Sequence, residues 1–96
     1  MFNEIAALER IVNGAIARGY YVSVNDGDAW PVKMSQYCEE IVSAADSVGE
    51  ALLVFRNADK VRVGSALVVW GNGPEELIAD CSDNALVLEL VGLGDS

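Results

Sequence analysis

Strand-like segments of this 96-residue chain are joined by short polar turns, with no βαβ alternation, which limits the fold to antiparallel pairing. Residues 20–24 are rich in aromatic and β-branched side chains, which favours a strand. Residues 25–28 contain an Asp-Gly pair typical of a tight hairpin turn, and residues 29–33 would form the returning strand. Because Pro31 cannot donate a backbone hydrogen bond, we expect the returning strand to lie at a sheet edge or to contain a bulge.

A second pair of strands is predicted for residues 51–56 and 61–70, joined by the polar turn at 57–60. Gly64 inside the longer strand indicates a bulge or the close approach of another backbone. Residues 75–80 suit either a short strand or a helical turn. We favour a strand that pairs with residues 61–70.

Helical spacing of apolar residues predicts two helices in the first half of the chain. Residues 4–18 carry apolar side chains every three or four positions, and Asn3 can cap this helix. Residues 36–48 show the same spacing, with Tyr37 counted on the apolar side and Ser35 as the expected cap.

A last short helix is predicted at residues 85–92, because cap-forming residues precede an apolar run. This run is apolar nearly all round, which suits a deeply packed helix or an oligomer interface. The resulting order is α-β-β-α-β-β-β-α. It predicts one α+β domain over residues 1–96, with an antiparallel sheet of about five strands and helices packed on one face.

The net charge of −9 comes from fifteen acidic and six basic residues, and every base precedes residue 63. Direct binding to nucleic acid is disfavoured, since phosphate attraction needs clustered Lys and Arg. An acidic surface attracts a basic partner instead, including a nucleic-acid-binding protein. Alternatively, the acids only keep the protein soluble.

Candidate partner-binding residues are exposed acids together with aromatic anchors. Trp30 is a candidate for partial exposure because it lies beside Pro31 on the expected edge strand. One of Tyr20 and Tyr21 should point outward, since neighbouring residues of a strand face opposite ways. The alternative is that Trp30 and Trp70 both cover the core. The full candidate set is Glu75, Glu76, Asp80, Asp83, Glu39, Glu40, Trp30 and Tyr21.

No catalytic motif is evident. The chain has no histidine, and neither Cys38 nor Cys81 has a flanking Lys or Arg to favour the thiolate, so we interpret both as small buried thiols. The Gly71-Asn-Gly73 turn precedes Pro-Glu-Glu, which would repel a phosphate. Asp spacing fits no calcium loop. We expect no enzyme activity, no cofactor and no metal.

The longest uninterrupted apolar stretches, residues 66–70 among them, are far shorter than the roughly 20 residues of a membrane-spanning helix. Glu4 stands where a secretory signal would carry Lys or Arg. These features lead us to expect a complete cytoplasmic protein.

The segments GYYVSVNDGDAWPVK and VFRNADKVRVGSALVVWGNGPEELIADCSDN resemble small accessory proteins of bacteriophages and prophages of proteobacteria. The resemblance covers residues 19–91 and rests on turn and cap motifs: Asp-Gly followed by Trp, Val-Gly before an apolar strand, and the Gly-Asn-Gly to Ser-Asp-Asn run. It implies no catalytic residue. It implies instead that an antagonist of host defence, such as an anti-CRISPR protein, deserves consideration.

The leading hypothesis is therefore a non-enzymatic, phage-type inhibitor that binds a basic host protein, such as a CRISPR effector, through an acidic surface in the host cytoplasm. One alternative is an oligomeric small-ligand-binding or sponge protein whose subunit interface includes Leu86, Leu90 and Leu93. Another is a phage structural or scaffold component. A homodimer is compatible with the leading hypothesis.

Overall fold

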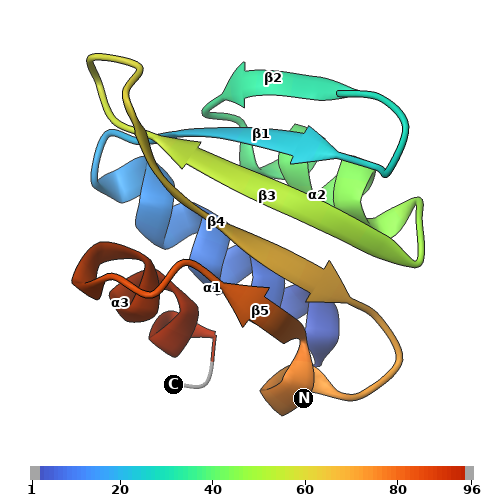
Figure 1. Ribbon diagram of the computed structural model, residues 1–96. Coiled ribbons are helices and arrows are strands. Elements are labelled where there is room, and N and C mark those ends of the chain that lie inside the picture. The colour runs from blue at the N-terminus through green and yellow to red at the C-terminus, as the bar shows by residue number, and fades with distance from the viewer. Residues whose placement is uncertain (1–2, 95–96) are drawn as a thin grey trace.

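A computed structural model describes residues 3–94 of the chain (Figure 1). Its elements, in chain order, are α1 (Glu4–Ala17), β1 (Tyr21–Asn25), β2 (Val32–Ser35), α2 (Cys38–Asp46), β3 (Glu50–Arg56), β4 (Arg62–Val69), the 3₁₀ turn η1 (Pro74–Glu76), β5 (Ile78–Cys81) and α3 (Ala85–Leu93).

The strands form one five-stranded antiparallel sheet in the order β2-β1-β3-β4-β5. Helices α1, α2 and α3 pack on the same side of this sheet and share one core, and α1 and α2 lie behind the strands in the view of Figure 1. The predicted α+β class, the order of elements and the one-sided packing of the helices are thus confirmed.

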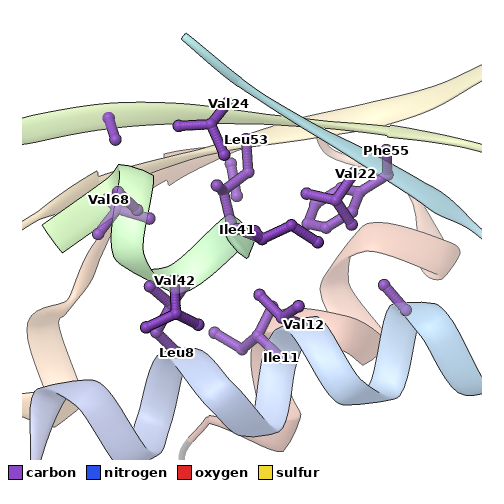
Figure 2. Close-up of a cluster of buried hydrophobic side chains, with 14 of the residues drawn as sticks. Leu8, Ile11, Val12, Val22, Val24, Ile41, Val42, Leu53, Phe55 and Val68 are labelled. Carbon is purple, nitrogen blue, oxygen red and sulfur yellow. The ribbon is translucent and has the colours of Figure 1, made fainter. Parts of the chain in front are cut away.

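The hydrophobic core fills the space between the helices and one face of the sheet (Figure 2). Helices α1 and α2 contribute apolar side chains from below, and strands β1, β3 and β4 contribute every second residue from above. Within a strand, Val22 and Val24 point into the core while Ser23 between them points away. Figure 2 labels Leu8, Ile11, Val12, Val22, Val24, Ile41, Val42, Leu53, Phe55 and Val68.

The first hairpin has a longer loop than the Asp-Gly pair predicts, because the returning strand β2 begins at Val32. The Asp26 carboxylate accepts hydrogen bonds from the backbone N–H groups of Asp28 and Ala29, which fixes the conformation of the loop. The N–H groups of Ala29 and, next, Asp28 keep the pKa of Asp26 below its ordinary value. The other expectation is confirmed: β2 is an edge strand and contains a bulge.

Helix α2 begins at Cys38, two residues later than predicted, and Ser35 is not its N-cap. The Ser35 hydroxyl instead accepts a hydrogen bond from the Tyr37 N–H and donates one to the Glu40 carboxylate. Tyr37 therefore sits before the helix and is 75% exposed, so the prediction that it lies on the apolar side was wrong.

The Gly71–Gly73 turn binds an anion from the chain itself. The Glu4 carboxylate accepts hydrogen bonds from the N–H groups of Gly71, at 2.9 Å, and Gly73, at 3.1 Å. Both glycines have positive φ angles, which orients their N–H groups toward a common acceptor.

For residues 75–80 the sequence allows a strand or a helical turn, and the structure contains both. Pro74–Glu76 is a 3₁₀ turn, and Ile78–Cys81 forms a strand beside β4.

Helix α3 is capped by Asn84, one of the three cap-forming residues at positions 82–84 that precede the apolar run. Its Leu90 is fully buried, and a Cβ added at Gly14 of α1 would lie in contact with it. Leu93 also packs against the core. In the oligomeric alternative, Leu90 was wrongly assigned to the subunit interface, since it is fully buried in the core of the single chain. Leu93 is partly buried and Leu86 is exposed.

Of the two alternatives predicted at Gly64 of β4, the bulge is confirmed, because the register with β3 shifts beside this residue. The close neighbours of Gly64 are side chains of Val87 and Ser82 and not another backbone. A Cβ added there would lie 2.5 Å from Val87 Cγ2 and 2.8 Å from Ser82 Oγ. Because these neighbours belong to a packed helix start, the Gly64→Ala substitution should lower the free energy of unfolding by about 1–3 kcal/mol in urea denaturation.

The control for this prediction is Gly49→Ala, since a Cβ at Gly49 meets no atom within 4 Å. That variant should stay within about 0.5 kcal/mol of the parent. Equal losses of stability in both variants would contradict the close packing of β4 on α3.

Candidate binding site on the open face of the sheet

The face of the sheet opposite the helices is not covered by another element in residues 3–94 (Figure 1). Two of its residues are nevertheless buried: Ser23 of β1 is 6% exposed and Val54 of β3 is 3% exposed. These residues are direct neighbours across the two strands. Because no backbone layer covers them, their burial means that surrounding side chains form a wall around this part of the face.

Ser23 and Val54 lie in a hollow of about 420 Å³ on the open face. This volume falls within the roughly 300–1,000 Å³ that small-molecule sites occupy in proteins. We call it the cationic hollow; its lining consists of Ser23, Trp30, Lys33, Met34, Val54, Arg56 and Lys60.

Three of the six basic residues of the chain line the cationic hollow, and its lining contains no acidic residue. Within residues 3–94, the one salt bridge joins Arg18 to Glu89, away from the hollow. Lys33, Arg56 and Lys60 therefore have no carboxylate partner in the part of the chain described. A chain with a net charge of −9 thus carries a local concentration of positive charge.

The bulge in β2 places two side chains beside the hollow. Val32 and Ser35 pair with Val24 and Val22, so Lys33 and Met34 together oppose the single residue Ser23. The Met34 N–H donates to Ser23 Oγ at 2.9 Å, and Met34 has a φ of 48°. The bulge therefore brings both Lys33 and Met34 to the lining of the hollow.

The loop between β3 and β4 positions the other two cations. The Asn57 side-chain oxygen accepts hydrogen bonds from the backbone N–H groups of Asp59 and Val61, which fixes the turn between β3 and β4. Arg56 Nη1 donates to the Lys60 carbonyl at 3.0 Å, and Lys60 has a φ of 65°. Lys60 and Met34 are the two non-glycine residues with positive φ in residues 3–94, and both line the hollow. Such strained conformations cluster at functional sites.

The two tryptophans have different environments, so the alternative in which both cover the core is wrong. Trp70 packs against the core, and its indole Nε1 donates to the Ala45 carbonyl at 2.8 Å. Trp30 is 42% exposed and lines the cationic hollow. Tyr21 is half-buried and lines a neighbouring hollow beyond β2, together with the exposed Tyr37.

The predicted acidic residues are all exposed, but the structure distributes them between opposite edges of the sheet. Glu39 and Glu40 lie on α2, which packs beneath β1 and β2. The other four lie near the β5 edge: Glu75 and Glu76 on η1, Asp80 on β5 and Asp83 before α3. The sequence-predicted residues therefore do not form one continuous surface.

The cysteines are free thiols, and each is half-buried, which differs from the expected full burial. Burial, followed by the nearby carboxylates of Glu9 and Glu39, raises the pKa of the Cys38 thiol. Cys38 is therefore protonated at neutral pH and is a poor nucleophile.

Sequence reasoning found Trp30 but missed the cationic hollow around it. The bases come from two separate segments, Lys33 from one and Arg56 and Lys60 from the other, and only the pairing of β2 with β1 and of β1 with β3 brings them together. One signal was present in the sequence: in β2 and in β3, a basic residue directly follows an apolar one, as in Val32-Lys33 and Phe55-Arg56. Successive residues of a strand face opposite sides of the sheet, so each basic residue is expected on the face away from its apolar neighbour.

No family model, curated protein or solved structure matches the chain. Within residues 3–94, no three His, Cys, Asp or Glu side chains are grouped so as to hold a metal ion. The helices of this same part of the chain are all too short or too polar to cross a membrane.

The left-handed conformation of Lys60 gives a direct stability test. Lys60→Gly should be more stable than Lys60→Ala by about 1 kcal/mol in urea denaturation, because a Cβ is unfavourable at positive φ. At Arg62, an exposed strand position, the order should reverse, since glycine costs roughly 0.5–1 kcal/mol in a strand. If the glycine and alanine variants had the same order of stability at both positions, the left-handed conformation of Lys60 in the β3–β4 loop would be contradicted.

Proposed function

We propose that this chain is a non-enzymatic binding protein that captures an anionic group in the cationic hollow. The observation that carries the proposal is the grouping of Lys33, Arg56 and Lys60 around a half-exposed indole, with no acidic side chain in the lining. Charge-assisted hydrogen bonds from Lys and Arg are roughly twice as strong as neutral ones. An anion in the hollow would compensate three cations that have no carboxylate partner within residues 3–94.

The distribution of charge supports selective binding. The rest of the chain is strongly acidic, so long polyanions are repelled at a distance, while a short anionic group reaches the hollow with less repulsion. The lining also supports binding without catalysis. It offers no carboxylate, histidine or cysteine that could act as an acid, a base or a nucleophile. The one hydroxyl in the lining, that of Ser23, accepts a hydrogen bond from the Met34 N–H.

The proposal predicts that pyrophosphate binds to the protein at low ionic strength, measured by isothermal titration calorimetry. Lys60→Asn should weaken binding about fivefold, the effect of losing one charge-assisted contact of roughly 1 kcal/mol. Asparagine is chosen because it tolerates the left-handed conformation of residue 60.

The control is Arg10→Gln, which removes the same charge from an exposed position on α1 outside the hollow. This variant should bind pyrophosphate nearly as well as the parent. Absence of binding to the parent, or equal weakening in the two variants, would refute capture of anions in the hollow.

The phage-type inhibitor of a basic host protein is a second candidate function. It is favoured by the exposure of Glu75, Glu76, Asp80 and Asp83 near the β5 edge, in a part of the sequence with no base beyond residue 62. Complex formation through this edge would depend on these carboxylates and on salt concentration but not on Lys60, which distinguishes it from the cationic hollow.

A further inference from the structure

We propose that the ligand of the cationic hollow is a nucleoside monophosphate, with its base against Trp30 and its phosphate at the cations. This inference rests on the proposed function, since it names the chemical class of the captured anion. It follows from three properties of the hollow: the chemistry of its lining, its size and the charges around it.

The lining combines two kinds of surface. Trp30 and Met34 expose large apolar side chains, and the buried Val54 of β3 lines the same hollow. Lys33, Arg56 and Lys60 supply positive charge in the same hollow. A simple inorganic anion would use only the cations and leave the indole in water. A ligand that carries both a flat aromatic ring and a phosphate uses both surfaces, because nucleic-acid bases stack on aromatic side chains.

The size of the hollow favours one nucleotide over a longer strand. Its volume of about 420 Å³ lies near the lower end of the range for small-molecule sites. Further along the open face, the sheet presents Glu50 at the start of β3 and Asp80 on β5, both exposed. A continuing phosphate backbone would meet these carboxylates, whereas a single phosphate stays among the cations.

The test compares AMP, adenosine, inorganic phosphate and pyrophosphate by isothermal titration calorimetry on the full chain. AMP should bind at least about tenfold more tightly than inorganic phosphate, because stacking of one base contributes a factor of this size. Trp30→Leu should lower AMP affinity about tenfold and leave pyrophosphate affinity unchanged. Lys60→Asn should weaken both ligands, and Arg10→Gln should weaken neither.

Retained pyrophosphate binding in Trp30→Leu shows that this variant is folded, so its loss of AMP binding can be attributed to the ring. If AMP binds no more tightly than inorganic phosphate while pyrophosphate binding still depends on Lys60, the nucleotide is excluded and anion capture stands. Tighter binding of a Glu-rich peptide than of AMP, with the same dependence on Lys60, also excludes the nucleotide. If none of these anions binds, both the inference and the proposed function are refuted.

Discussion

The burial of only one face of the sheet is the constraint on which the rest of this structure depends. Alternate residues of β1, β3 and β4 pack against the helices, and Val22, Leu53 and Phe55 are completely removed from water. Burying such side chains stabilises the fold by about 1.5–3 kcal/mol each, so the register of the strands is firmly set. The residues between them, Ser23 and Val54 among them, must then lie on the opposite face. The cationic hollow is built on these residues.

Overall charge and local charge have opposite signs in this protein. The net charge of −9 governs the field at a distance, whereas a ligand in the hollow meets Lys33, Arg56 and Lys60 at close range. The backbone supports this arrangement at two strained points, the bulge at Met34 and the turn at Lys60. By contrast, the glycine turn at Gly71–Gly73 is already occupied by the Glu4 carboxylate and serves to attach α1 to the β4–β5 connection.

The elements could be predicted from the sequence because their signals are local. Asn3 caps α1 as expected, one of the predicted cap-forming residues caps α3, and Gly64 lies beside a bulge in β4. Features that depend on tertiary contacts were missed. Tyr37 has helical spacing, but the hydrogen bonds of Ser35 delay the start of α2 and leave the ring exposed. Leu90 is as apolar as an interface residue would be, and its burial follows from the packing of α3 against α1, where the Leu93 side chain lies against Gly14. The cationic hollow requires the bulge in β2, which places Lys33 and Met34 opposite Ser23. The sequence predicts an edge or a bulge at this strand, but it does not predict which residues lie opposite Ser23.

The most direct test of this account is the quenching of Trp30 fluorescence by ions of opposite charge. The Trp70→Phe variant leaves Trp30 as the single tryptophan, and neutral acrylamide gives its accessibility independently of charge. The cationic hollow predicts that iodide quenches Trp30 more strongly than caesium at equal ionic strength, and that Lys33→Gln and Lys60→Asn reduce this difference. Stronger quenching by caesium, as the net charge of −9 alone would produce, would contradict the account.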